Sequence, residues 1–216
     1  MPGDPYQLPR SDLVRAAPVL AAAFRQDPVW SRLFESELRL DRRRAAFEAP
    51  LRFCRRYGRV YATSPNLEGI AAFVPGEQAD MTFARMVLSG GVVSGMRMGM
   101  GLARRMMPVF QPVQADRKHN MIGRSYVYLL ILGVAPEHQG QGWGGRLLRA
   151  VIEYCRQRGR ALYLETETEA NVRMYERFGF RTIKTITLPE LKLPMWEMVL
   201  EPEQRPAAAP TQPRDG

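Results

Sequence analysis

The chain has 216 residues, 45% of them hydrophobic, which is enough apolar sequence for one sizeable core and a small appended region. No stretch reaches the roughly 18 uninterrupted apolar residues that a membrane span requires, since Arg85, Arg97 and Arg104 interrupt the most apolar candidate. The formal net charge of +9 raises the question of nucleic acid, but the arginines are scattered and no aromatic pattern interleaves with them, so we expect neither nucleic acid nor a membrane as a partner.

The N-terminus and the cysteines indicate the compartment. MPGDPYQLPR has an acid and prolines where a secretory signal needs a basic start and an apolar run. Cys54 and Cys155 lie far apart and have no metal-ligand spacing. We therefore expect a cytoplasmic protein with no metal site and no disulfide, in which both thiols are half-buried.

The first third of the chain predicts helices followed by a hairpin. Ser11 and Asp12 precede LVRAAPVLAAAF, where a short oxygen-bearing side chain can cap a helix. DPVWSRLF interrupts the helical pattern, because the residue before a proline is driven out of helical geometry. A second helix is predicted over about 42–57, and the apolar runs 60–62 and 70–74 flank SPNLEG as a hairpin.

The segment 81–121 is rich in methionine and glycine, as in MRMGMGLARRMM. Methionine is flexible and glycine weakens a helix interior, so any helices here are expected to be interrupted and adaptable. Two interpretations stay open: irregular core, or a mobile wall of a substrate pocket.

From Tyr126 onward, strands and helices alternate. YVYLLILGV predicts a strand, WGGRLLRAVIEYCRQRG a helix closed by Gly159, and ALYLET another strand. A short helix, EANVRMYERFG, and the strands FRTIKTITL and MWEMVL follow. We expect residues 1–10 to be an N-terminal extension, 11–200 a single domain, and the proline-rich, polar 201–216 a disordered tail.

GVAPEHQGQGWGGRLL combines a strand, a glycine-rich turn and a helix. Such a turn directs unpaired backbone amides and a helix N-terminus at one point, which suits a phosphate. Gly140, Gly142 and Gly145 also spell G-x-G-x-x-G with Glu165 twenty residues on. We reject dinucleotide binding, since PEHQ separates the strand from the first of these glycines and too few strands could follow.

Two motifs in this order resemble the GNAT superfamily of N-acetyltransferases. LGVAPEHQGQGWGGRLL is similar to its motif A, whose Q/R-x-x-G-x-G/A core Gln139, Gly142 and Gly144 would supply. NVRMYERFGF is similar to motif B, with Asn171 and Tyr175 in place. LGVAPEHQGQGWG, LETETEANVRMYERFGF and AFRQDPVW resemble the puromycin N-acetyltransferase-like branch in particular. The resemblance covers roughly 20–34 and 125–200.

The resemblance implies a fold and a co-substrate. The fold would be a GNAT-like α/β (α+β) fold, with a central mixed, mostly antiparallel twisted sheet of about six to seven strands flanked by helices. Acetyl-CoA (coenzyme A) would bind with its pyrophosphate on the turn amides and its pantetheine arm beside the strand that YVYLLILGV forms. The implied cofactor-binding residues are Leu132, Gly133, Val134, Gln139, Gly140, Gln141, Gly142, Trp143, Gly144, Gly145, Asn171 and Tyr175.

The resemblance also implies catalytic roles. The amide of Leu132 would face the thioester carbonyl and stabilise the oxyanion that forms during attack. Tyr175 would be the acid that meets the departing thiolate, since an ordinary tyrosine has a pKa near 10 and a thiol about 8.5. Asn171 would hydrogen-bond the pantetheine region or, alternatively, cap the short helix.

A base must take the proton from the attacking amine. We choose Glu165, at the end of ALYLE, because in this fold that strand end lies across the splayed sheet from Leu132. Alternation of side chains puts Tyr163 on the same face as Glu165. Glu167, Glu169 and a chain of waters are the alternatives.

These residues together predict an acetyl-CoA-dependent N-acetyltransferase that transfers the acetyl group directly to a primary amine of a small molecule, without a covalent enzyme intermediate. The alternatives are a non-catalytic acyl-CoA-binding regulatory module and a protein or peptide N-acetyltransferase. Monomer and homodimer are both compatible with the sequence.

Overall fold

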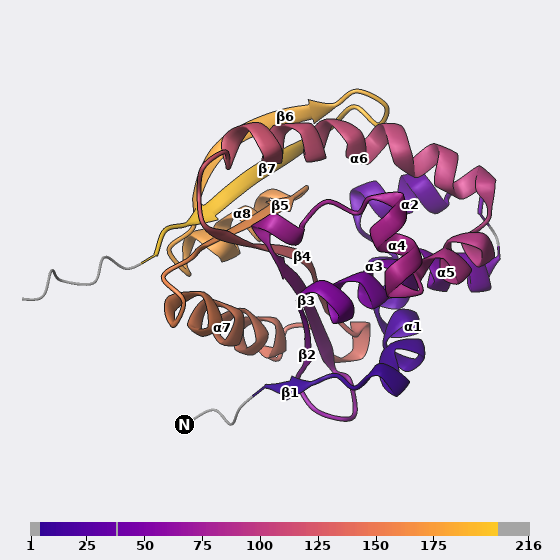
Figure 1. The fold of residues 1–216 in the computed structure, drawn as a ribbon, viewed down its shortest axis with the longest axis horizontal. Helices are drawn as coiled ribbons and strands as arrows, with labels where there is room; N and C mark the ends of the chain where they lie inside the picture. The colour runs from indigo at the N-terminus through magenta and orange to yellow at the C-terminus, as the bar shows by residue number, and fades with distance from the viewer. Residues whose placement is uncertain (1–4, 38, 203–216) are drawn as a thin grey trace, which may run out of the picture.

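The computed structural model describes residues 5–37 and 39–202, and its centre is one seven-stranded sheet in the order β1-β2-β3-β4-β5-β7-β6 (Figure 1). Neighbouring strands are antiparallel except for β4 and β5, which are parallel. The predicted mixed, mostly antiparallel sheet is therefore confirmed. The strands are β1 (Tyr6–Gln7), β2 (Arg59–Ala62), β3 (Gly69–Pro75), β4 (Tyr126–Val134), β5 (Ala161–Thr166), β6 (Arg181–Leu188) and β7 (Leu193–Leu200).

Helices cover both faces of the sheet (Figure 1). They are α1 (Leu13–Ala23), α2 (Pro28–Phe34), α3 (Leu40–Tyr57), α4 (Phe83–Ser89), α5 (Gly91–Met98), α6 (Met100–Asn120), α7 (Trp143–Arg156) and α8 (Glu169–Glu176). Helices α1 and α3 pack on one face, and α7 and α8 on the other. Helix α6 runs along β6 and β7, on the side of α2.

β3 divides the interior into two cores, because it is covered on both faces. Ile70, Ala72 and Val74 join the core under α1 and α3. Ala71 and Phe73 join the core under α7. A strand covered on both faces is expected to be apolar at successive positions, as GIAAFVP is.

The sheet opens between β4 and β5. Their pairing ends at Tyr128 and Tyr163, although β4 continues to Val134. The register between β3 and β4 shifts so that Leu130 has no partner residue, which is a β-bulge. Bulges bend a strand, and the second half of β4 is therefore left with one edge that β5 does not pair.

The predicted N-terminus of the first helix is confirmed, because α1 begins at Leu13 with Asp12 in the cap position. The predicted cap hydrogen bond is absent: a 3-10 turn leads into α1, and neither side chain accepts a cap hydrogen bond. The prediction that DPVWSRLF interrupts the helical pattern is wrong. The segment forms α2, because Oδ1 of Asp27 accepts from the amides of Val29 (3.0 Å) and Trp30 (2.9 Å) and the proline occupies the first helical position.

The methionine-rich segment forms three helices, so the prediction of interrupted helices is confirmed. Gly90 (φ 76°) separates α4 from α5, and Gly99 (φ 84°) separates α5 from α6. Helix α6 nevertheless has 21 residues despite Pro108 and Pro112. Its apolar contacts reach α2 and the β6–β7 hairpin.

Several expectations concern the ends of the chain and the thiols. Tyr6–Gln7, in the predicted extension, pair with β2. Of the predicted tail 201–216, residues 203–216 lie outside the described residues. Cys54 and Cys155 are free and fully buried rather than half-buried. Within the described ranges, no helix combines the length and the apolar character needed to cross a bilayer.

Candidate active site

The glycine-rich turn presents unpaired amides at the start of α7. Gly140 (φ 76°) and Gly142 (φ 83°) adopt the left-handed conformation, and a Cβ at either would meet nothing within 4 Å. No side chain caps α7. The first α7 amide with a helical acceptor is that of Arg146, which donates to the Gly142 carbonyl at 3.1 Å. Within the described chain, the amides of residues 140–145 therefore have no hydrogen-bond acceptor.

Side chains of the motif fold the turn. Nε2 of Gln139 donates to the Val134 carbonyl at 3.1 Å, and Nε2 of Gln141 donates to the Glu137 carbonyl at 3.0 Å. Nε1 of Trp143 donates to Oε1 of Gln141 at 3.3 Å. The glutamine side chains are thus occupied within the loop. The Gln139 amide also donates to the Pro136 carbonyl at 3.4 Å, so of the two glutamines only Gln141 has a backbone amide left for a ligand.

Gly133 is required by packing. A Cβ there would lie 2.7 Å from Cδ2 of Leu20 and 3.0 Å from Cε2 of Phe24. Helix α1 therefore approaches β4 closely just before the turn. Leu132, opposite Ala71 in the sheet, packs toward α7 instead. Val134 lies against Gly144, so the end of β4 and the start of α7 are in contact.

Tyr175 and Asn171 lie one turn apart on α8. The alternative role for Asn171 as a cap is wrong, because Oγ1 of Thr168 accepts from the Asn171 amide at 3.2 Å and makes Thr168 the cap. The Tyr175 ring packs against Phe180 at 5.4 Å between centroids. Burial, followed by the charge of Glu167, raises the pKa of Tyr175 well above its ordinary value. The phenol holds its proton more tightly than an exposed tyrosine would.

Glu165 lies where β4 and β5 separate. The residue is half-buried, and its Oε1 is buried without a hydrogen-bond partner in the described chain. Burial raises the pKa of Glu165 to about 7, against the opposing effect of the neighbouring Tyr128 and Tyr163 side chains and of Arg117. A carboxyl with a pKa near neutrality is suited to act as a general base.

The two alternative bases have different environments. Glu169 is exposed and forms a 3.2 Å ion pair with Arg173. Glu167 is half-buried, and burial and the adjacent Asp27 carboxylate raise its pKa. A protonated Glu167 beside Tyr175 is a hydrogen-bond donor rather than a base.

Sequence reasoning missed the buried polar residues behind Glu165. Arg117 of α6 is 3% exposed, donates to the Tyr126 hydroxyl at 2.8 Å and lies over the Tyr128 ring. Glu197 of β7 is 0% exposed and is the cross-strand partner of Glu165. The one available signal was a carboxylate in the middle of the apolar strand MWEMVL.

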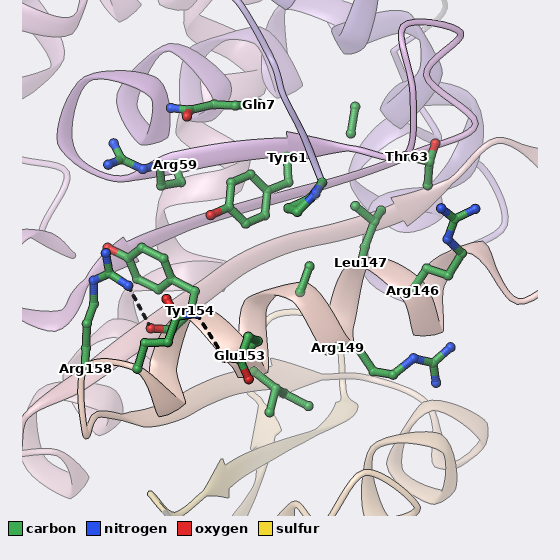
Figure 2. A pocket seen from close by; sticks show the side chains of 15 residues that line it. Gln7, Arg59, Tyr61, Thr63, Arg146, Leu147, Arg149, Glu153, Tyr154 and Arg158 are labelled. Carbon is green, nitrogen blue, oxygen red and sulfur yellow. Dashed lines mark hydrogen bonds between the residues drawn. The ribbon is translucent and has the colours of Figure 1, made fainter. Parts of the chain in front are cut away.

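A separate cavity of about 870 Å³ lies between the β1–β2 edge and α7 (Figure 2). It is lined by arginines 59, 146, 149 and 158, among other residues, and none of these four has a carboxylate partner among the described residues. None of the predicted site residues lines it. The predicted site residues therefore lie outside this cavity, at the glycine-rich turn, on α8 and at the opening of the sheet.

Known proteins share both the sequence around the turn and the fold. Residues 99–180 match the acetyltransferase (GNAT) family. An uncharacterized N-acetyltransferase of Schizosaccharomyces pombe is 32% identical over 99 residues, which is 45% of this chain and 40% of that protein. The match thus spans less than half of that relative's length.

Solved structures extend the likeness over nearly the whole chain. A histone acetyltransferase HPA2 and related acetyltransferase from Corynebacterium glutamicum has a TM-score of 0.62 at 18% identity and covers 95% of this chain and 100% of its own. A putative arylalkylamine N-acetyltransferase from the mosquito Aedes aegypti has a TM-score of 0.65 at 16% identity, over 90% and 85%. The chain thus has the GNAT acetyltransferase fold, and its residues 99–180 carry the sequence of that family.

Proposed function

We propose that the chain is an acetyl-CoA-dependent N-acetyltransferase that transfers an acetyl group directly to a primary amine of a small molecule. One observation carries the proposal: the unpaired amides of residues 140–145 lie at the end of the strand whose free edge borders the opening in the sheet. This arrangement offers an anion site and an extended groove side by side.

The residues present fit acetyl-CoA. The amides of Gly140 to Gly145 and the positive end of the α7 dipole suit its pyrophosphate. The free edge of β4, at Leu132, Gly133 and Val134, offers backbone partners to the pantetheine amides. When bound, acetyl-CoA supplies an activated acetyl thioester.

The remaining steps belong to side chains and backbone of this chain. Glu165 accepts the proton that the acceptor ammonium must lose, since its pKa of about 7 leaves it ionised at slightly basic pH. The Leu132 amide stabilises the developing oxyanion. Tyr175 returns a proton to the leaving sulfur, and Asn171 orients the arm beside it.

The proposal has finer parts, each with its own support. The acceptor class is supported by the name of the arylalkylamine relative, and a peptide acceptor by that of the histone acetyltransferase relative. A place in the puromycin N-acetyltransferase-like branch is supported by the three sequence stretches that resemble it. We also propose a single domain over 11–200 and a cytoplasmic location.

The test is calorimetry with acetyl-CoA, followed by mass spectrometry of an amine pool. The pool holds arylalkylamines, aliphatic polyamines, puromycin and peptides with free N-termini. We expect saturable binding and a mass increase of one acetyl group on a small amine. Absence of any heat with acetyl-CoA would contradict the proposal. Binding without transfer to any amine would favour the acyl-CoA-binding module, and transfer only to peptides would favour the peptide enzyme.

A matched pair of variants locates the cofactor site. Gly142→Asp places a carboxylate among the amides and is expected to abolish binding of acetyl-CoA. Gly123→Asp is the control, because Gly123 also has a positive φ (69°), also has nothing within 4 Å of a Cβ, and lies outside the glycine-rich turn. Equal loss of binding in both variants would contradict the assignment of the turn.

A further inference from the structure

The cavity beside α7 exists because the sheet is wider than the helix that covers it. β3 presents the buried Phe73 to the core under α7, whereas Arg59 and Tyr61 of β2, and Thr63 just after it, line the cavity. These three residues alternate along the chain, so their side chains project from one face of the sheet. The result is a polar hollow of about 870 Å³, within the range of roughly 300–1,000 Å³ that is usual for small-molecule sites.

The four arginines of the cavity fall at its two ends (Figure 2). β2 runs parallel to β4, because both are antiparallel to β3, and α7 runs back along the sheet after the turn that follows β4. Arg59, at the start of β2, therefore lies at the same end as Arg158, which follows α7. Arg146 and Arg149 mark the other end, near the start of α7. Since a helix rises about 1.5 Å per residue, the two ends are on the order of 15 Å apart.

The guanidinium groups are oriented by their neighbours but not neutralised by them. Arginines 146, 149 and 158 lie over the rings of Trp143 (4.9 Å), Phe178 (5.7 Å) and Tyr154 (3.8 Å), respectively. A contact of this kind uses the flat face of the guanidinium and leaves N–H groups at its edge for an anion. Arg59 donates to the Gly58 carbonyl at 3.5 Å, which leaves most of its donors available.

The carboxylate of Glu153 does not compensate these charges. It is the one carboxylate among the cavity-lining residues of the described chain. Its oxygens accept from Nε and Nη2 of Arg156, both at 2.7 Å, and from Nε2 of Gln157 at 2.9 Å. Arg156 does not line the cavity, so Glu153 is matched by a cation outside it. The cavity therefore keeps an excess of positive charge at both ends.

We propose that this cavity binds a linear small molecule with an anionic group, a carboxylate or a phosphate, at each end. A guanidinium matches either group with two parallel N–H donors. Tyr61 and Leu147 lie between the two ends, so the middle of the ligand is uncharged and largely apolar (Figure 2). None of the turn residues 139–145 lines the cavity, and the site is thus separate from the proposed acetyl-CoA site.

Calorimetry with simple linear dianions tests the ligand class. The ligands are sebacate, the bisphosphate of decanediol, and decanoate as a control of similar length with one anionic end. We expect at least one dianion to bind saturably and about tenfold or more tightly than decanoate, because the second charged end adds charge-assisted hydrogen bonds. The tighter of the two dianions identifies the end group. Binding of neither dianion, or equal binding of decanoate, overturns the proposal.

Variants locate the bound dianion. Arg59→Gln and Arg146→Gln each remove one charge from one end, and each is expected to weaken binding about tenfold or more. Arg104→Gln is the control, because Arg104 is exposed on α6 and does not line the cavity. Ala150→Trp keeps all four arginines but fills the middle of the cavity, and it is expected to abolish binding. Equal losses in the Arg104 variant, or unchanged binding to Ala150→Trp, would place the dianion elsewhere and overturn the proposal.

Competition with acetyl-CoA separates the two sites. We expect the Kd of the dianion to stay within about twofold when acetyl-CoA is present at saturating concentration. A Kd that rises in proportion to the acetyl-CoA concentration would assign the cavity to the coenzyme and overturn the proposal. The dianion titrations require no acetyl transfer. A chain that binds the dianion but not acetyl-CoA would contradict only the proposed function, and the converse result would contradict only the inference drawn from the cavity.

Discussion

The burial of Glu165 affects both its strength as a base and the stability of the folded protein. Its folded pKa of about 7 lies above the ordinary value of 4.5 because burial favours the neutral form. The stability that the neutral carboxyl contributes is therefore complete below the unfolded pKa and is lost as pH rises through the folded pKa. Above the folded pKa, Glu165 is ionised and can accept a proton, but the folded protein is less stable than it is at low pH.

Replacing Glu165 by glutamine tests this relation. Glu165→Gln is expected to raise the free energy of unfolding at about pH 8 by on the order of 2 kcal/mol, and to change it little at about pH 5. Urea unfolding at the two pH values measures the difference. An equal effect at both would show that the carboxyl is not desolvated in the folded chain.

Tyr175 can be tested without disturbing its packing. Tyr175→Phe keeps the ring against Phe180 but removes the hydroxyl. We expect kcat to fall by about 10- to 100-fold, with the affinity for acetyl-CoA within twofold of wild type. Steady-state kinetics and calorimetry measure the two quantities. A mutant as fast as its parent would mean that another group protonates the thiolate.

Residues that stand within a short motif could be proposed for the site from the sequence, whereas residues that only distant strand pairing brings together could not. Gly142 and Tyr175 stand within motifs that a short window contains. Glu197 lies 32 positions after Glu165, and only the register of β5 with β7 brings them together. Arg117 gave no signal, since an arginine in a helix is ordinarily solvated, and its burial follows from Asp80 and the two tyrosines beside it.

At the scale of elements, local chemistry predicted most helices and strands. The exceptions have physical causes. DPVW contains a proline, which suggested an interruption, and Asp27, which can cap a helix. The helix forms because the Asp27 side chain accepts hydrogen bonds from two backbone amides. Helix α6 tolerates Pro108 and Pro112 because its contacts with α2 and the β6–β7 hairpin outweigh the lost backbone hydrogen bonds. Tertiary packing of this kind is not visible in a short window.

The contact between α1 and β4 gives a prediction for packing. Gly133→Ala places a methyl group 2.7 Å from Leu20, so we expect a loss of about 1–3 kcal/mol in the free energy of unfolding. Gly101→Ala is the control, because it lies in α6 with nothing within 4 Å, and it is expected to gain about 0.5–1 kcal/mol. Chemical denaturation measures both. A neutral Gly133→Ala would mean that α1 moves away without cost.

At the scale of the whole molecule, the order of the elements and the resemblance of the two motifs predicted a mixed, mostly antiparallel sheet. They did not predict the opening between β4 and β5. The bulge at Leu130 and the early end of the β4–β5 pairing are properties of non-local strand pairing. The proposed site lies at that opening. This is why the residues could be named from the sequence while their arrangement could not.

Ligand binding should stabilise the whole chain if the turn and the opening form one site. At about a hundred times its Kd, acetyl-CoA is expected to add roughly 2.7 kcal/mol to the free energy of unfolding and to raise Tm by several degrees. Differential scanning calorimetry at increasing concentrations measures the shift. The Gly142→Asp variant should show none, and a shift of equal size in it would locate the binding elsewhere.

The burial of both native cysteines has a practical consequence. Burial raises the pKa of Cys54 and of Cys155, so neither side chain is a ready nucleophile. A cysteine introduced at an exposed position such as Met107 on α6 would then react alone with a maleimide dye. A fluorescence or spin label could therefore be attached to α6 without first removing any natural residue.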